Sequence, residues 1–286
     1  MSHTAQPTAP GMTFSPESRR IIAGVGLSHA RRKSRLPAFM DVTQSATGLV
    51  LALFLWAHMC FTSSILISKD AFWTLVQASG GYFITGRDMP WVHSVVVAIM
   101  LALVAVHAIL ALRKFPINYR QYRNFTGHYK LIRHGDTTLW WVQVVTGVAL
   151  TALAFPHLLE MMMRPEEIGP YQSGLRVYES WLAVSLLFLV ATEVHGAIGL
   201  YRICVKWGFF EGKNPDESRR RLKAGMWALI AILLTAGSLT LGAYYKLGSE
   251  VQYTPEAVYT PAWLRNPPQA EAPSWWPSWI KGAPQH

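Results

Sequence analysis

The segment WVHSVVVAIMLALVAVHAILAL, residues Trp91–Leu112, decides what kind of fold this chain can adopt. It contains no Asp, Glu, Lys or Arg. It is also long enough to cross the hydrocarbon core of a bilayer, which takes roughly 20 apolar residues per helix. A helix satisfies its own backbone hydrogen bonds in lipid. The segment therefore predicts a transmembrane helix.

Four other apolar segments of similar length share this pattern, and polar or charged residues flank each of them. They are Val42–Ile67, Thr137–Met163, Tyr178–Tyr201 and Leu222–Tyr245. The composition agrees, because 51% of the 286 residues are hydrophobic and only 15% are charged. High hydrophobicity excludes intrinsic disorder, and two cysteines are too few for a disulfide scaffold. We predict an all-α integral membrane bundle of five transmembrane helices.

The positive charge of the chain, +10 in total, gathers on one side of these spans. The N-terminal arm, the loop 113–136 and the segment 202–223 hold 19 of the 26 Lys and Arg residues. The positive-inside rule then places the N-terminus in the cytoplasm and the C-terminus outside. Since topology accounts for the charge, no nucleic-acid partner is expected. The predicted domains are a basic arm (1–40), a five-helix domain (41–246) and an irregular outer tail rich in Pro and Trp (247–286).

Four histidines lie deep inside the first four spans, one in each. The first and third spans run outward and carry His58 ~26 Å and His157 ~32 Å from their inner ends, at ~1.5 Å of rise per residue. The second and fourth spans run inward and carry His107 ~9 Å and His195 ~10 Å from their inner ends. The four histidines thus form an inner pair, His107 with His195, and an outer pair, His58 with His157.

Two imidazoles at one depth, from two different helices, can hold a haem iron by both of its axial positions. Two such pairs predict two haems stacked across the membrane. Two ligands per depth do not complete the usual zinc set. The alternative is hydrogen bonding between helices, which explains one histidine better than four at matched depths. Small residues in the spans would let a macrocycle or another helix approach closely: Gly48, Gly147, Gly196 and Gly199.

Glu193 lies two residues before His195 and is the only carboxylate well inside a span. An ionisable group at this depth suggests proton transfer, and a hydrogen bond to a neighbouring helix is the equally open alternative. Other side chains near the span ends suit haem propionates, or else act as snorkelling and capping residues. They are Gln44, Ser45, Lys114, Trp140 and Lys206 at the inner end and Arg176 at the outer end.

Several motifs resemble the dihaem cytochrome b subunit of quinol:fumarate reductase. They are DVTQSATGLVLALFLWAHM (Asp41–Met59), RKFPINYRQY (Arg113–Tyr122), RHGDTTLWW (Arg133–Trp141) and EVHGAIGLYR (Glu193–Arg202). The resemblance covers about residues 30–247 and looks closest to the menaquinol-dependent enzymes of bacteria that respire fumarate or sulfate.

The resemblance implies a membrane anchor in the cytoplasmic membrane, within a three-subunit complex that forms a homodimer of heterotrimers. A flavoprotein with FAD would reduce fumarate, an iron–sulfur protein would supply its electrons, and this chain would take them from menaquinol through two haem b groups. It assigns His107 and His195 to the proximal haem, and His58 and His157 to the distal haem. It also implies proton transfer by Glu193, and it matches Gln44, Ser45, Trp140, Lys206 and Arg176 to propionate partners.

One position departs from the family pattern. The family's quinol-site glutamate falls on Gly80 by an ungapped match, and Asp70, Asp88 and His93 are the nearby alternatives as proton acceptors. Two other functions stay open. One is the same subunit working as a succinate:quinone reductase, and the other is a haem-binding anchor without a redox role.

Overall fold

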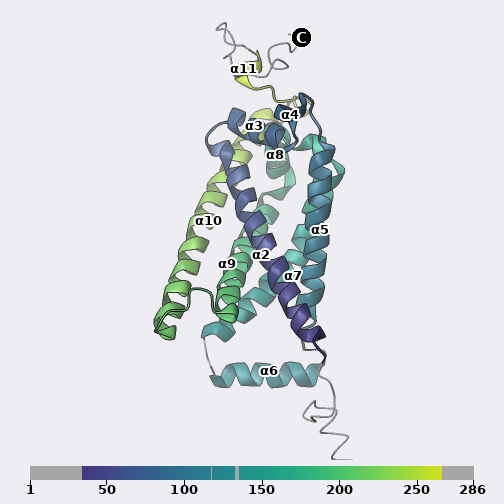
Figure 1. Ribbon diagram of the computed structural model, residues 1–286. Coiled ribbons are helices and arrows are strands. Elements are labelled where there is room, and N and C mark those ends of the chain that lie inside the picture. Colours follow the sequence, from purple (N-terminus) through teal and green to yellow (C-terminus); the bar gives the residue numbers. More distant parts are fainter. Residues whose placement is uncertain (1–33, 117, 133–134, 266–286) are drawn as a thin grey trace, which may run out of the picture. The chain divides into compact units, whose positions relative to one another are not determined.

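The computed structural model describes residues 34–116, 118–132 and 135–265, and every regular element in these ranges is helical. Five of the described helical stretches are long and apolar enough to cross a membrane. They are built on α2 (Leu36–Ser63), α5 (Trp91–Leu112), α7 (Gly135–Met163), α9 (Leu182–Trp207) and α10 (Pro215–Val251), as Figure 1 shows. The predicted all-α bundle of five membrane helices is therefore confirmed.

The chain divides into two units, residues 1–42 and residues 43–286. In the first unit, the side chain of Ser34 accepts a hydrogen bond from the backbone N–H of Leu36 at 3.2 Å, where α2 begins. Most of the predicted basic arm (1–33) and the end of the predicted tail (266–286) lie outside the described residues.

Several predicted span ends differ from those in the structure, and the starts of the fourth and fifth spans do so for local reasons. The fourth span begins at Leu182, because a π-helical segment, η3 (Val177–Trp181), separates it from α8 (Pro170–Arg176). The fifth span begins at Pro215, where the Asn214 side chain accepts hydrogen bonds from two backbone N–H groups of the first turn. A cap and a proline at the first turn begin a helix regardless of the charged residues that follow. That helix also continues to Val251, past the predicted end at Tyr245.

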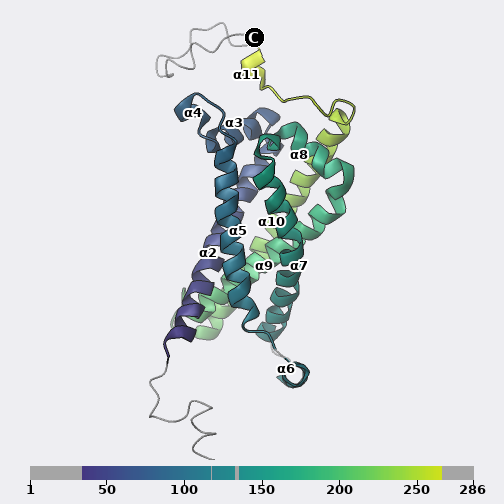
Figure 2. The same ribbon diagram turned by 90° about the vertical axis from the view of Figure 1, so that its right-hand side faces the viewer.

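The short helices gather at one end of the bundle, which we call the outer end (Figures 1 and 2). They are η1 (Ser64–Leu66), α3 (Lys69–Ser79), α4 (Tyr82–Thr85), η2 (Pro165–Glu167), α8 and α11 (Ala262–Arg265). At the opposite, inner end α6 (Tyr119–Ile132) runs across the direction of the spans. The ring of Tyr122 on α6 meets the ring of Trp141 on α7 edge-on, with centroids 6.2 Å apart. The sequence analysis expected only a loop here, because α6 is too polar to resemble a span.

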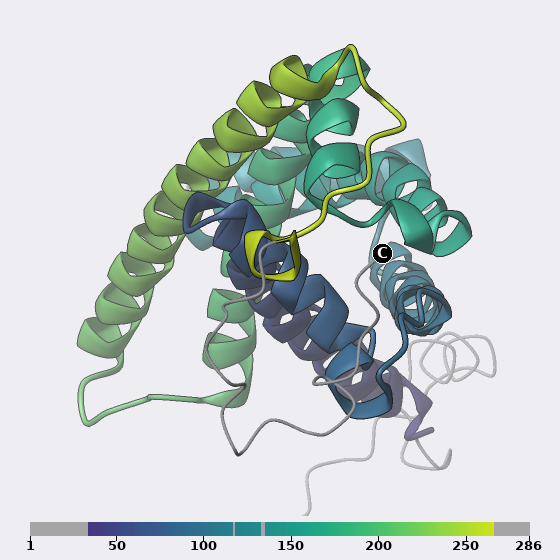
Figure 3. The same ribbon diagram turned by 90° about the horizontal axis from the view of Figure 1, so that it is seen from above.

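The spans pack in sequence around the bundle, as the view along it in Figure 3 shows. α10 packs against α8 and α9, α9 packs against α7, and α7 packs against α5. α2 meets α10 through side chains, since Thr240 donates a hydrogen bond to Ser63 Oγ at 2.9 Å and Tyr244 donates to the carbonyl of Thr62 at 3.2 Å.

Two clusters of buried apolar residues pack the helices together, one toward each end of the bundle. The inner cluster consists of Leu139, Ala197, Ile198, Tyr201, Met226 and Ile230, from α7, α9 and α10. The outer cluster consists of Ile65, Phe72, Val76, Leu175, Val177, Tyr244, Leu247 and Val251. The histidine-bearing depths lie between these clusters along the spans.

The segment after α10 covers the outer end. Tyr259 donates a hydrogen bond of 2.5 Å to Asp70 Oδ1, and the Ala262 backbone N–H donates to the same oxygen at 3.0 Å. The Trp263 ring meets Trp73 of α3 with centroids 5.7 Å apart. Burial raises the pKa of Tyr259, and the hydrogen bond and charge of Asp70 raise it further, so this phenol stays protonated and donates at neutral pH. The predicted irregular tail therefore includes a packed segment as far as Arg265.

Helices α8 and α10 approach each other at two glycines. A β-carbon at Gly174 would lie 2.9 Å from the backbone nitrogen of Gly248 and 3.1 Å from the carbonyl oxygen of Tyr244. A β-carbon at Gly248 would overlap the carbonyl group of Gly174. Neither obstacle is the flexible end of a side chain, so larger residues cannot be accommodated by a rotamer change.

Gly248→Val should therefore separate α8 from α10 and destabilise the protein by about 1–3 kcal/mol, the usual cost of overpacking a close contact. Thermal unfolding of the detergent-purified complex measures the effect. Gly242→Val is the matched control, since it lies on the same helix and a β-carbon there meets nothing within 4 Å. Equal melting temperatures for the two variants would contradict the close approach.

Candidate functional site

The outer histidine pair meets inside the bundle. His58 of α2 and His157 of α7 have ring centroids 6.3 Å apart and an angle of 66° between their planes. Since a bond from a metal to an imidazole nitrogen is about 2 Å long, this separation leaves room for one metal atom bound by both rings. The predicted pairing of these two residues thus corresponds to a contact in the structure.

The inner pair comes from the other two helices. His107 lies on α5 and His195 lies on α9. The Nδ1 atom of His195 lies 3.0 Å from the carbonyl oxygen of Gln143 on α7. A carbonyl only accepts hydrogen bonds, so Nδ1 carries the proton and the lone pair of a neutral ring is on Nε2. That is the tautomer of a histidine prepared to ligate a metal through Nε2.

Two ligands at each depth suit a porphyrin better than a bare metal ion. Among the described residues, no group of three or more His, Cys, Asp and Glu side chains could hold a metal ion. A haem needs only the two axial ligands from the protein, whereas a structural zinc ion needs four ligands and a catalytic one three. The donor set therefore fits haem.

Aromatic rings surround the outer pair. Phe54 and Phe61 lie one turn on either side of His58 and stack parallel to its ring, at centroid distances of 5.9 and 6.4 Å. Phe188 of α9 lies 5.4 Å from the ring of His157. Flat apolar side chains of this kind provide the surface that a planar macrocycle would contact.

Three polar atoms in the spans are buried without a hydrogen-bond partner among the described residues. They are Gln44 Oε1, Trp56 Nε1 and Glu193 Oε1. A buried polar atom without a partner is costly and needs an explanation. A bound group that brings its own polar atoms, as haem does through its propionates, provides one. Trp56 was not among the site residues predicted from the sequence.

The side chains predicted to contact propionates have varied surroundings. Arg176 pairs with Glu160 at 2.7 Å and with Glu167 at 3.5 Å. Lys206 lies over the ring of Trp207, 5.0 Å from its centroid. Trp140 contacts Phe115 and Trp141, at centroid distances of 6.5 and 5.2 Å. Ser45 follows Gln44 on α2, and Lys114 follows the last turn of α5.

Glu193 is buried in α9, with 1% of its surface exposed. It is among the largest fully buried side chains of the described structure, together with the apolar residues Ile198, Pro170 and Pro261. Most buried polar side chains have a hydrogen-bond partner, and Glu193 Oε1 has none among the described residues. This geometry favours a group that exchanges a proton over one that fixes the packing of two helices.

A second polar site lies at the outer end, where the sequence departs from the family pattern. His93 Nε2 lies 2.8 Å from Ser79 Oγ. A β-carbon at Gly80 would lie 3.2 Å from His93 Cε1. The atoms His93 Nδ1 and Gln77 Oε1 are both buried without a partner among the described residues. Of the two acids, Asp70 is engaged by Tyr259 and Ala262, whereas Asp88 is exposed.

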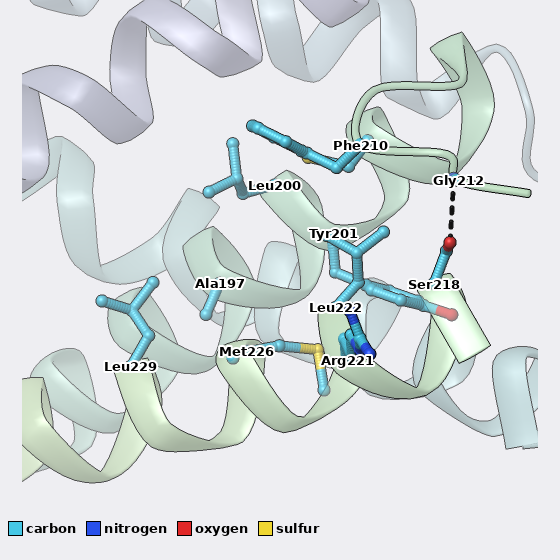
Figure 4. Close-up of a pocket in the computed structure, with 12 residues that line it drawn as sticks. Ala197, Leu200, Tyr201, Phe210, Gly212, Ser218, Arg221, Leu222, Met226 and Leu229 are labelled. Carbon is cyan, nitrogen blue, oxygen red and sulfur yellow. Dashed lines mark hydrogen bonds between the residues drawn. The ribbon is translucent and has the colours of Figure 1, made fainter.

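A cavity of about 590 Å³ lies elsewhere, between the inner ends of α9 and α10 (Figure 4). Its walls are mainly apolar, with Leu200, Phe210, Met226 and Leu229 among the lining residues. At its rim, Gly212 donates a backbone hydrogen bond of 2.9 Å to Ser218 Oγ. None of the predicted site residues lines this cavity.

Comparisons with known proteins point in one direction. A family model described as the succinate dehydrogenase/fumarate reductase transmembrane subunit matches residues 119–243, which contain His157, Glu193 and His195. The fumarate reductase cytochrome b subunit of Wolinella succinogenes is 46% identical over 226 residues, covering 79% of this chain and 88% of that protein. The corresponding subunit of Helicobacter pylori is 43% identical over 236 residues, covering 82% of this chain and 91% of that protein.

Proposed function

Since this chain belongs to the family of fumarate reductase cytochrome b subunits, we propose that it is a dihaem anchor that oxidises menaquinol for a fumarate-reducing complex. The observation that carries the proposal is the arrangement of four histidines on four membrane helices as two pairs. Each pair joins helices that are separated in the chain, and the outer pair is spaced for one shared metal atom.

The residues of the chain then have defined tasks. His58 and His157 hold the outer, distal haem, and His107 with His195 holds the inner, proximal one. Propionates are bound by the polar and cationic side chains near the span ends: Gln44, Ser45, Lys114, Trp140, Arg176 and Lys206. When bound, the two haem b groups supply one-electron transfer between menaquinol and an iron–sulfur subunit.

Glu193 carries a proton within the membrane in step with this transfer. Menaquinol oxidation near the outer face and fumarate reduction in the cytoplasm would together move negative charge inward. An inward-moving proton offsets that charge, so quinol oxidation does not have to work against the membrane potential. The burial of Glu193 and its unpartnered Oε1 support this role.

The partners dock on the side that carries most of the basic residues. An iron–sulfur subunit and a flavoprotein with FAD would contact the cytoplasmic face, and the assembled heterotrimers would pair as a homodimer. The chain would lie in the bacterial inner membrane with its N-terminus in the cytoplasm and its C-terminus in the periplasm. Basic surface segments assist docking through charge complementarity.

The test is haem content together with turnover. The complex should contain two low-spin b haems per copy of this chain, both reducible by a menaquinol analogue, and should reduce fumarate faster with that donor than it oxidises succinate. One haem or none would overturn the dihaem proposal. Haems that quinol cannot reduce would leave only a haem-binding anchor, and faster succinate oxidation would reverse the direction.

For the proton acceptor of the quinol site, we infer His93 rather than Asp70 or Asp88. Its ring lies against Gly80, the position of the family's glutamate, and would crowd any side chain there. Ser79 fixes one ring nitrogen, and the other is buried without a partner among the described residues. On the same helix as Ser79, Gln77 Oε1 is also buried without a partner among the described residues and adds a hydrogen-bond acceptor for a quinol hydroxyl.

His93→Leu should lower menaquinol-dependent fumarate reduction about a hundredfold, the lower range for loss of a general base. Both haems should stay bound, and fumarate reduction from a dye that reduces the soluble subunits directly should be unchanged. Asp88→Asn is the matched control in the same loop and should keep normal quinol activity. If Asp88→Asn abolished quinol oxidation and His93→Leu did not, the acceptor would be Asp88.

A further inference from the structure

A short sequence pattern occurs twice in the chain, once in each outward-running helix that carries an outer histidine. Residues 44–48 read QSATG and residues 143–147 read QVVTG, so both have the form Gln-x-x-Thr-Gly. His58 and His157 each follow the glycine of their own copy by ten residues. The repeated pattern lies on α2 and α7, at the depth of the inner histidines rather than the outer ones.

In the α2 copy, Thr47 Oγ1 lies 3.2 Å from His107 Nδ1. The same hydroxyl donates to the backbone carbonyls of Thr43 and Gln44, at 2.9 and 3.1 Å. A hydroxyl has one proton to donate, so toward His107 it can only accept. His107 Nδ1 is therefore the donor in this contact.

The α7 copy repeats these contacts with the other inner histidine. Thr146 Oγ1 lies 3.2 Å from His195 Nδ1 and donates to the carbonyls of Val142 and Gln143, at 2.8 and 3.2 Å. The Gln143 carbonyl also lies 3.0 Å from His195 Nδ1. Both inner histidines therefore have Nδ1 against a threonine hydroxyl of a neighbouring helix, and His195 Nδ1 also lies against a glutamine carbonyl.

The glycine of each copy makes room for the ring that the threonine holds. A β-carbon at Gly48 would lie 2.8 Å from His107 Cε1, and one at Gly147 would lie 3.0 Å from His195 Cε1. Real β-carbons essentially never make a contact shorter than 3.0 Å, and a contact of 3.0 Å is tighter than nine in ten of those observed. Each imidazole thus lies against the bare backbone of the opposite helix, and any side chain there would displace it.

We propose that the two Gln-x-x-Thr-Gly segments are imidazole seats, which position the two inner histidines as iron ligands and set the potential of the inner haem. The inference rests on the proposed function. With Nδ1–H donated to the seat, Nε2 of each ring is the ligating atom. Hydrogen bonding at Nδ1 makes the imidazole a stronger donor to a metal. A stronger donor favours the more oxidised iron, so the seats lower the potential of the inner haem relative to an unseated ligand.

Both seats contact ligands of the inner haem, His107 and His195. The potential of the outer haem therefore serves as an internal reference. Thr47→Val and Thr146→Val remove the hydroxyl and keep the shape of the side chain. In the full complex, a redox titration followed by visible absorbance should show the inner haem shifted to a more positive potential in each variant. The shifts should add in the double variant, and the outer haem should not move.

Serine variants and a second threonine provide the controls. Thr47→Ser and Thr146→Ser restore the hydroxyl and should restore the original potential. Thr151 also lies on α7, and Thr151→Val removes only a hydroxyl that donates to the Gly147 carbonyl. The potentials of both haems should therefore stay unchanged. The proposal would be overturned if the potential of the inner haem were unchanged in the valine variants, or if the potentials of both haems shifted equally. Fewer than two haems in the unmodified complex would instead reject the proposed function.

The glycines give an independent test. Gly48→Ala should displace His107 and convert the inner haem from low-spin to high-spin or release it, while the outer haem stays low-spin. Gly225→Ala on α10 is the control, because a β-carbon there meets nothing within 4 Å. Two unaltered low-spin haems in Gly48→Ala would contradict the close approach of the His107 ring.

Discussion

His107→Ala and His195→Ala should each remove the same single haem, and His58→Ala and His157→Ala should each remove the other. The reason is geometric, since the two members of each pair come from different helices, lie at one predicted depth, and in the outer pair have ring centroids 6.3 Å apart. Loss of either histidine of a pair would leave the haem iron with one protein ligand instead of two. We expect the haem content to fall from two per chain to one in all four variants.

The measurement is a redox titration of the purified complex with haem quantified per chain. The two haems are distinguished by potential, so the identity of the lost haem is read directly. His93→Ala is the control for histidine removal as such, because that ring lies at the outer end and should leave both haems bound. If His58→Ala and His107→Ala removed the same haem, the pairing by depth would be wrong.

Pairing by depth could be predicted because it uses only the rise of a helix and the direction of each span. Those two quantities placed His58 level with His157, and the structure brings their rings to 6.3 Å. The five spans could also be predicted from the sequence, since each is an apolar segment long enough to cross a membrane. What the rise does not give is the rotation of each helix about its axis.

The rotation of each helix decides which side chains face each other. The contacts between side chains of different helices could therefore not be predicted from the sequence. The contact of Thr47 with His107 joins α2 to α5 and depends on the rotation of both helices. The position of His93 against Gly80 likewise needs the turn between α3 and α5. Arg176 was expected at a propionate, and its ion pairs with Glu160 and Glu167 follow from the fold of the loop between α7 and α9.

Two further features were not predicted, because each resembles a more common pattern in membrane proteins. α6 is a helix of polar and aromatic residues, and a search for apolar spans passes over it. The indole N–H groups of Trp56 and Trp141 are buried, although tryptophan near a span end is typical of the lipid interface. In both cases the residue types were visible, and only the packing shows their surroundings.

Glu193→Gln should leave both haems bound and lower menaquinol-driven fumarate reduction about a hundredfold, in the range expected for loss of an acid–base group. Glutamine has nearly the size of glutamate and can hydrogen-bond, but it cannot release a proton. Only 1% of the surface of the side chain is exposed, so it is out of contact with bulk solvent. Fumarate reduction from a dye that bypasses this chain should be unaffected.

The alternative role of Glu193, a hydrogen bond that fixes two helices, predicts the opposite ranking of variants. Glutamine would preserve such a bond and keep full activity, whereas Glu193→Asp would shorten the side chain and break it. A proton carrier reverses the order, because aspartate keeps the acid and should retain more quinol activity than glutamine. Full quinol-driven activity in Glu193→Gln would therefore reject proton transfer, and activity restored by aspartate alone would establish that the acid itself is required.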